Sequence, residues 1–159
     1  MDKIVSFTID HEKLLPGLYV SRVDKVGAEV VTTFDMRVTT PNKEPVMDTG
    51  AIHTIEHLMA TYIRNDREWA DKLIYFGPMG CRTGFYMIFA GERTPLDIKN
   101  LLDRVMDYVI NFSDVIPGVS PKECGNYNDH NLDEARYYAR KYRDEVLADF
   151  TEKRYVYPE

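Results

Sequence analysis

The sequence predicts one α+β domain over residues 1–159, in which an antiparallel β-sheet packs against helices on one side. The length of 159 residues is sufficient for a single domain with its own hydrophobic core. Residues 29–40 alternate between apolar and polar side chains, which is typical of a strand in an antiparallel sheet. Segments with strand and helix patterns do not alternate regularly along the chain, so a parallel sheet is not favoured.

The first predicted elements are this strand and the helix that follows it. One face of the strand carries Phe34, Met36 and Val38, and the other carries Asp35, Arg37 and Thr39. We therefore expect a half-buried strand. Residues 41–50 have the composition of a loop, and Thr49 is the predicted N-cap of a helix over about 50–64.

The middle of the chain is predicted to hold a short helix and a core strand. The helix covers 67–73, and Gly77, Pro78 and Gly80 then interrupt regular structure. Residues 81–91, CRTGFYMIFAG, are rich in aromatic and apolar side chains, which indicates a strand in the core.

Two longer helices are predicted in the second half of the chain. The Thr-Pro dipeptide at 94–95 opens the first, which carries an apolar stripe through residue 112. An irregular connection follows over 113–128. Residues 131–134 resemble a capping box for a helix over 132–150, whose tyrosines can pack on the sheet or on another subunit.

Composition argues against several classes of function. The net charge is −6, from 26 acidic and 20 basic residues, which disfavours nucleic acid as a partner because phosphate binding needs a positive field. No apolar run approaches the ~20 residues of a membrane-spanning helix, and residues 1–15 lack the apolar stretch of a secretory signal. We therefore expect a cytoplasmic protein with no membrane partner, in which Cys81 and Cys124 do not form a disulfide.

Residues 53–57, HTIEH, place two histidines four positions apart with a glutamate before the second. At about 100° per residue, His53, Glu56 and His57 share one arc of a helix of roughly 100°, and apolar residues take the opposite arc. Histidines at this spacing can bind one cation, and the order H-x-x-E-H inverts that of the H-E-x-x-H metalloproteases. The pattern favours a metal site over a charged surface patch.

A catalytic metal site also needs a third protein ligand and an open coordination position. The candidates are Cys124, Cys81, His130, His11 and several carboxylates. Spacing does not choose among them, because the third ligand can come from any distant loop.

Three tracts of the sequence resemble one known family. They are HTIEHL (53–58), PMGCRTGFY (78–86) and ECGNY (123–127), and the resemblance begins with SFTIDH (6–11) and FDMR (34–37). Their order and spacing are similar to those of S-ribosylhomocysteine lyase, the enzyme that makes the precursor of autoinducer-2.

The resemblance implies a metal site and two acid/base groups. The matching metal ligands are His53, His57 and Cys124, and the matching acid/base residues are Glu56 and Cys81. We expect Arg82, or the cation itself, to favour the thiolate form of Cys81.

The resemblance also implies how the substrate is held. Ser6, His11 and Arg37 match substrate-binding positions, whereas His130 lies in none of the tracts and is expected to be structural. Residues 75–77, Tyr-Phe-Gly, stand where some members of the family carry a more polar sequence. An acidic substrate contact therefore cannot be transferred to this segment.

The reaction of the family splits S-ribosylhomocysteine into homocysteine and 4,5-dihydroxy-2,3-pentanedione. The carbonyl moves from C1 to C2 and then to C3, after which β-elimination breaks the C5–sulfur bond. Each shift needs a Lewis acid and a group that collects and returns a proton. The resemblance further implies one divalent metal per subunit, natively iron(II) and replaceable by zinc or cobalt, and a homodimer with its active sites at the subunit interface.

Two other interpretations explain part of the pattern. A small metallopeptidase with the inverted motif would use Glu56 to activate water but gives Cys81 no role. A non-enzymatic module would use the metal only to stabilise its fold, which usually takes four protein ligands, whereas the motifs supply three.

Overall fold

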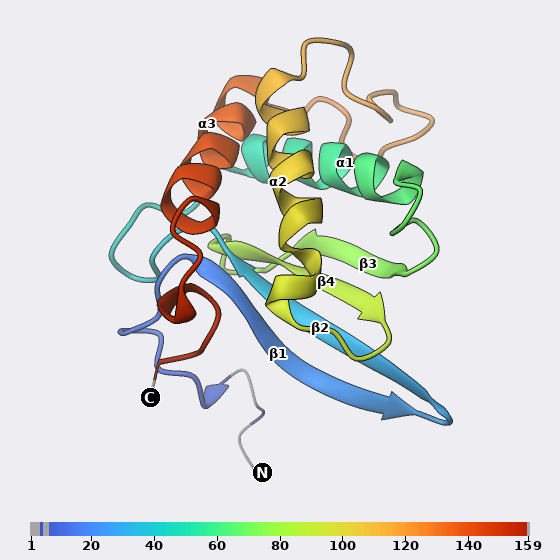
Figure 1. Ribbon diagram of the computed structural model, residues 1–159. Coiled ribbons are helices and arrows are strands. Elements are labelled where there is room, and N and C mark those ends of the chain that lie inside the picture. The colour runs from blue at the N-terminus through green and yellow to red at the C-terminus, as the bar shows by residue number, and fades with distance from the viewer. Residues whose placement is uncertain (1–3, 5–6, 159) are drawn as a thin grey trace.

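Four strands form one antiparallel sheet in the order β1-β2-β4-β3, and the helices α1, α2 and α3 lie on one side of it (Figure 1). The structure is a computed structural model that describes residues 4 and 7–158. The strands are β1 (Gly17–Val26), β2 (Glu29–Arg37), β3 (Leu73–Pro78) and β4 (Gly84–Ala90). The helices are α1 (Thr49–Asn65), α2 (Pro95–Asn111) and α3 (Leu132–Tyr142). The predicted α+β class is confirmed.

Strand β1 was not predicted. It pairs with β2 through a tight turn in which Gly27 has a φ of 64°, and the register is interrupted between Val20 and Arg22. Its second half carries Asp24 and Lys25, which lie at the exposed edge of the sheet. Charges on an edge strand are common because they discourage pairing with other chains. In the sequence, these charges obscure the alternation of apolar and polar residues by which a strand is recognised.

The prediction that β2 is half-buried is wrong, because both of its faces are covered. Asp35 and Arg37 are 2% and 3% exposed, although they lie on the polar face. The two side chains form an ion pair with each other, with an Arg37 Nη2–Asp35 Oδ2 distance of 2.6 Å. Burial of charged side chains is tolerated when they are paired and hydrogen-bonded in this way.

The predicted helix over 67–73 is also wrong. Asp66 accepts hydrogen bonds from the backbone N–H groups of Glu68 and Trp69 and thereby fixes a turn, after which edge strand β3 begins at Leu73. Pro78 ends β3, a position where a missing N–H costs no bond in the sheet. The strand predicted at 81–91 is confirmed as β4, with its start moved to Gly84 because the preceding residues form a turn.

The predicted helices at 50–64 and 95–112 are confirmed with small changes at their ends. The N-cap of α1 is Asp48 and not Thr49, because the Asp48 side chain accepts a hydrogen bond of 2.8 Å from the Gly50 N–H. The helix predicted over 132–150 is shorter than expected. Its α-helical part ends at Tyr142 and continues as one π-helical turn over Arg143–Leu147.

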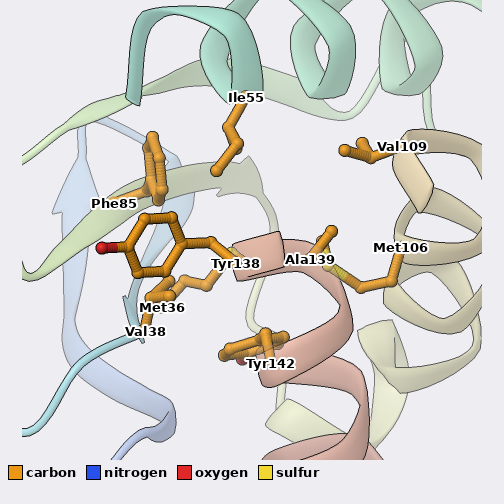
Figure 2. A pocket seen from close by; sticks show the side chains of 9 residues that line it. All are labelled: Met36, Val38, Ile55, Phe85, Met106, Val109, Tyr138, Ala139 and Tyr142. Carbon is orange, nitrogen blue, oxygen red and sulfur yellow. The ribbon is translucent and has the colours of Figure 1, made fainter. Parts of the chain in front are cut away.

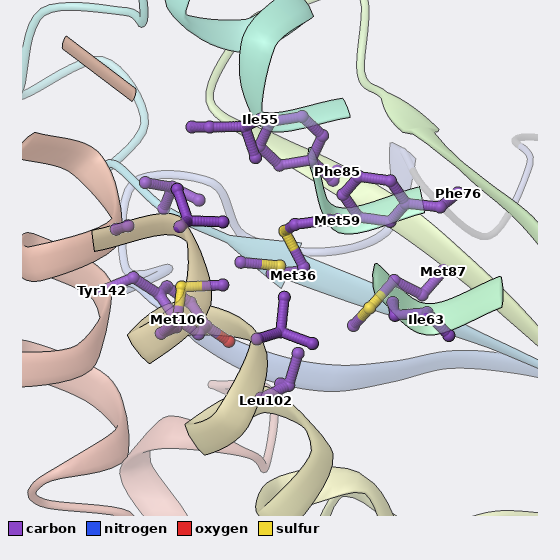
Figure 3. Close-up of a cluster of buried hydrophobic side chains, with 14 of the residues drawn as sticks. Met36, Ile55, Met59, Ile63, Phe76, Phe85, Met87, Leu102, Met106 and Tyr142 are labelled. Atoms are coloured by element: carbon purple, nitrogen blue, oxygen red, sulfur yellow. The ribbon is translucent and has the colours of Figure 1, made fainter. Parts of the chain in front are cut away.

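The core lies between the inner face of the sheet and the three helices. Figure 3 shows Met36 of β2, Met87 of β4, Met59 of α1 and Met106 of α2 pointing toward one another within it. Each of these four methionines is at most 1% exposed. Flexible thioether side chains fill irregular gaps of this kind.

A small void interrupts this core where α1, α2 and α3 face the sheet. Figure 2 shows Ile55, Phe85 and Tyr142 among the side chains around it, and its volume is about 10 Å³. A space of that size holds about one water molecule at most. The core therefore offers no room for a substrate, and the candidate site has to lie at the surface. In the described part of the chain, no helix is long and apolar enough to cross a membrane.

Candidate metal centre

Helix α1 presents one face to the core and the opposite face to a surface hollow. Ile55 and Leu58 are buried, whereas His53, Glu56 and His57 are only half-buried. This division confirms the two arcs expected from the sequence.

The rings of His53 and His57 are oriented by backbone carbonyls. His53 Nδ1 lies 2.9 Å from the Asp129 carbonyl oxygen, and His57 Nδ1 lies 2.7 Å from that of Pro117. A carbonyl only accepts hydrogen bonds, so each Nδ1 donates, and in the neutral ring the lone pair then lies on Nε2. This arrangement is the usual one for metal-binding histidines.

Cys124 approaches the same point from the connection between α2 and α3, which passes next to α1 (Figure 1). Its Sγ lies 3.3 Å from His53 Nε2. Two such ligands on one tetrahedral zinc ion would be about 3.5 Å apart. The structure thus brings Cys124 to the two histidines, as the resemblance implied.

His130 joins this group, although sequence reasoning set it aside as structural. Its ring stacks on that of His53 with centroids 4.1 Å apart, and it meets the His57 ring edge-on at 4.9 Å. One ligand atom from each of His53, His57, Cys124 and His130 lies within 4.8 Å of the others. The only sequence signal was the position of His130 six residues after Cys124, because the tract ECGNY ends at residue 127.

The hydrogen bonds around Thr54 fix the tautomer of His130. The Thr54 hydroxyl donates to the Gly50 carbonyl at 2.8 Å and accepts the Asn131 N–H at 3.0 Å. His130 Nδ1, 3.1 Å from the same hydroxyl, must therefore be its donor. The Nε2 of His130 is left as a buried lone pair with no hydrogen-bond partner among the described residues. Burial, followed by the neighbouring His53 and His57, lowers the pKa of His130 and keeps it neutral.

These donors fit a transition metal. Imidazole nitrogens and a thiolate suit zinc, iron(II) or cobalt(II), whereas magnesium and calcium prefer oxygen ligands. Among the candidate third ligands, Cys124 and His130 belong to the cluster, and no other described residue joins it, so Cys81 and His11 lie outside.

The cluster borders an open hollow of about 500 Å³. Glu56 lines the hollow beside His53 and His57, and so does Gly118. Gly118 has a φ of 75°, and a Cβ atom there would come within 3.3 Å of the His57 ring. A glycine at this position therefore lets the loop close against the histidine. The cluster has four possible donors, which is the number usual in a structural site, but it opens to a hollow with a carboxylate, which is typical of a catalytic site.

Cys81 belongs to a second group of polar side chains. It lies in the turn between β3 and β4, next to Arg82, whose φ of 58° is unusual for a residue other than glycine. The Cys81 thiol is exposed, and its Sγ lies 3.1 Å from Thr83 Oγ1 and 3.7 Å from Arg37 Nη1. Cys81 is not among the described residues that line the hollow at the metal cluster.

The electrostatic environment of Cys81 favours the thiolate. Partial burial alone would raise its pKa, but hydrogen bonds from Thr83 and the charge of Arg37 outweigh that effect and lower the pKa below its ordinary value. The guanidinium in contact with Cys81 is thus that of Arg37, whereas the sequence suggested Arg82.

The structure describes two of the three residues that were predicted to hold the substrate, Arg37 and His11. Arg37 is buried against Asp35 and Thr83, with its Nη1 directed toward Cys81. His11 is half-buried, and its Nδ1 contacts the Ile9 carbonyl at 2.9 Å. Ser6 lies outside the described residues.

Comparisons with known proteins identify the family of the chain. The model of the family described as S-ribosylhomocysteinase (LuxS) matches residues 4–153. Proteins named S-ribosylhomocysteine lyase from Clostridium beijerinckii and Desulfotalea psychrophila are 54% and 53% identical to the chain over 158 residues, which cover 99% of each chain. The protein of that name from Finegoldia magna is 51% identical over 159 residues, the whole of both chains. The chain therefore belongs to the S-ribosylhomocysteinase (LuxS) family.

Proposed function

We propose that the protein is a metal-dependent carbon–sulfur lyase that cleaves S-ribosyl-L-homocysteine to L-homocysteine and 4,5-dihydroxy-2,3-pentanedione, the precursor of autoinducer-2. The observation that carries this proposal is the convergence of His53, His57 and Cys124 beside Glu56 at an open hollow. Membership of the family over residues 4–153 supports the lyase over the metallopeptidase and the structural module.

The reaction needs no net oxidation, reduction or water. The open-chain sugar first moves its carbonyl from C1 to C2 and then to C3, by removal of a proton from one carbon and its return to the neighbouring one. The carbonyl at C3 makes the proton on C4 acidic. Loss of that proton expels the thiolate from C5, and the sulfur leaves as homocysteine after protonation.

His53, His57 and Cys124 would hold one divalent metal ion per subunit, natively iron(II), with zinc or cobalt as possible replacements. When bound, the ion would polarise the substrate's carbonyl oxygens and so make the neighbouring C–H groups acidic. The Nδ1 atoms of both histidines are already committed to carbonyls, so the Nε2 lone pairs are oriented for binding.

Glu56 and Cys81 would be the two groups that move protons. Glu56 projects from α1 into the same hollow as the metal ligands. Cys81 is exposed, and the hydrogen bonds from Thr83 and the charge of Arg37 lower the pKa of its thiol, which favours the thiolate form that a base requires. The reaction transfers protons at several carbons, which favours two such groups on different sides of the substrate.

We further propose that the active enzyme is a homodimer, with Cys81 of one subunit facing the metal centre of the other. Within one chain, Glu56 lines the hollow at the metal centre and Cys81 is not among the described residues that do so. Exposed apolar side chains on β3, Ile74 at 49% and Tyr75 at 48%, support a covered surface on the strand that leads to the Cys81 turn. Ser6, His11 and Arg37 would then bind substrate at the interface, in the cytoplasm.

The test is release of free thiol from S-ribosylhomocysteine by the purified protein loaded with iron(II), cobalt or zinc. We expect thiol and diketone to form in equal amounts, and both to disappear in the metal-free protein and in Cys81→Ala. Absence of thiol release from folded, metal-loaded protein would exclude this function. Thiol release that survives Cys81→Ala would exclude the proposed role of Cys81 alone.

A further inference from the structure

We propose that Tyr157, acting through Asp35, is a positioning residue that holds Arg37 against the Cys81 thiol. The inference rests on the proposed function only in so far as Cys81 serves as a proton carrier. It assigns a role to the segment after α3, which the chemistry above does not use.

The buried ion pair with Asp35 fixes the direction of the Arg37 guanidinium group. Arg37 donates from Nε to Asp35 Oδ1 at 3.1 Å and from Nη2 to Asp35 Oδ2 at 2.6 Å. A two-point contact of this kind fixes the plane of the guanidinium group. The third nitrogen, Nη1, is thereby aimed at Thr83 Oγ1, 2.6 Å away, and at Cys81 Sγ, 3.7 Å away. The orientation of the Asp35 carboxylate therefore sets the position of the charge beside Cys81.

The hydroxyl group of Tyr157 orients the Asp35 carboxylate. The Tyr157 hydroxyl donates a hydrogen bond of 3.0 Å to Asp35 Oδ2, the oxygen that also accepts from Arg37 Nη2. Burial, followed by the negative charge of Asp35, raises the pKa of Tyr157 far above its ordinary value. The phenol therefore stays protonated and remains a donor at every pH at which the protein would work.

Contacts with Tyr19 and with the Pro16 carbonyl hold the segment of Tyr157 in place. Its ring stacks on that of Tyr19, with centroids 4.6 Å apart and planes inclined by 10°. Tyr19 is fully buried and lies directly opposite Asp35 in the register of β1 and β2. Arg154, three residues before Tyr157, donates from Nη1 to the Pro16 carbonyl at 3.0 Å. The segment is thus fastened to β1, and its tyrosine reaches across that strand to the carboxylate on β2.

Through these contacts, Tyr157 affects how strongly the positive charge of Arg37 stabilises the Cys81 thiolate. Arg37 is the positive group in contact with the thiol, and Thr83 is its hydroxyl partner. Four tyrosines also interact electrostatically with Asp35, namely Tyr19, Tyr86, Tyr142 and Tyr157. Without the Tyr157 hydroxyl, Asp35 would lose one donor and draw the Arg37 guanidinium more strongly to itself. The thiolate of Cys81 would then lose part of its stabilisation.

The experiment compares Tyr157→Phe with the matched control Tyr155→Phe. Tyr155 lies in the same segment, but its ring packs on Phe150 with centroids 5.3 Å apart. The rate of alkylation of Cys81 by iodoacetamide is measured against pH on the metal-loaded protein, and mass spectrometry separates the Cys81 peptide from the Cys124 peptide. Only the thiolate reacts, so the midpoint of the profile reports the pKa of Cys81.

We expect Tyr157→Phe to move the midpoint upward by about 0.5 unit and to slow alkylation at pH values below the midpoint about threefold. Tyr155→Phe should reproduce the unsubstituted profile, and the thermal midpoints of all three proteins should agree within a few degrees. A Tyr157→Phe profile that coincides with the unsubstituted one overturns the proposal. An equal shift in Tyr155→Phe overturns it too, because the effect would then be a general disturbance of the segment.

The alkylation profile is independent of turnover. If the protein releases no thiol from S-ribosylhomocysteine but the profile shifts as described, the positioning role stands and the proposed function fails. If thiol is released and the profile does not shift, the proposed function stands and the positioning role of Tyr157 fails.

Discussion

At the scale of single residues, two features bring Glu56 together with His53 and His57, the proposed metal ligands on α1. The spacing of three and four positions puts the side chains on one face, and two carbonyls from the connection between α2 and α3 fix the histidine rings. The sequence revealed the first feature because helical spacing is a local property. The second could not be predicted, since Asp129 and Pro117 are distant in sequence and contribute only backbone atoms.

The Glu56 carboxylate is expected to move protons without holding the metal. Glu56→Gln keeps the shape of the side chain and removes its basicity, so thiol release should fall about 100-fold or more while metal content stays unchanged. Glu123→Gln is the matched control, because Glu123 lines the same hollow and its carboxylate accepts a hydrogen bond from Ser120. Loss of metal in Glu56→Gln, or an equal loss of activity in the control, would contradict this assignment.

His130 is expected to support the metal centre through its contact with the His53 ring. His130→Ala removes both that stacking partner and the buried Nε2 lone pair at the cluster. We expect the affinity for zinc or cobalt to fall about 10- to 100-fold, as measured by competition with a chelator. His11→Ala, which alters a histidine outside the cluster, should leave metal affinity unchanged. Unchanged affinity in His130→Ala would return this histidine to the purely structural role expected from the sequence.

At the scale of elements, the strongly periodic segments were predictable and those shaped by tertiary contacts were not. Helices α1 and α2 and strands β2 and β4 follow patterns that repeat along the chain. Strand β3 was not predicted, and the turn before it was taken for a helix, because the partner strand β4 and the contacts of Asp66 decide the conformation of this segment. The burial of the polar face of β2 was missed because its cover, Tyr157, comes from a segment 122 residues away.

The start of α1 gives a direct test of one corrected boundary. Asp48→Ala should lower the free energy of unfolding by about 1 kcal/mol, because the N-cap side chain satisfies a helix N–H that has no partner within the helix. The Asp48 carboxylate also accepts a hydrogen bond from Asn131 and so ties α1 to the start of α3. Thr49→Ala should cost clearly less in the same urea titration. A larger effect at Thr49 would restore the N-cap that the sequence suggested.

At the scale of the whole molecule, the fold separates the two halves of the proposed active site. The metal ligands and Glu56 lie where α1 meets the connection between α2 and α3, whereas Cys81 lies in the turn between β3 and β4. Helical spacing in the sequence indicated His53, Glu56 and His57, whereas Cys124 and Cys81 received their roles only through the resemblance to a family. Neither spacing nor composition could indicate that Cys81 would stand apart from the metal centre in a single chain.

A subunit-mixing experiment tests the central claim most directly. Dimers that carry Glu56→Gln in one subunit and Cys81→Ala in the other contain one site with both native groups, if each site combines Glu56 of one subunit with Cys81 of its partner. Unfolding and refolding the two inactive variants together should therefore restore thiol release from S-ribosylhomocysteine to about a quarter of the unsubstituted value, since half of the dimers are mixed and each has one intact site. A mixture that stays as inactive as its two parents, although mixed dimers have formed, would contradict the account.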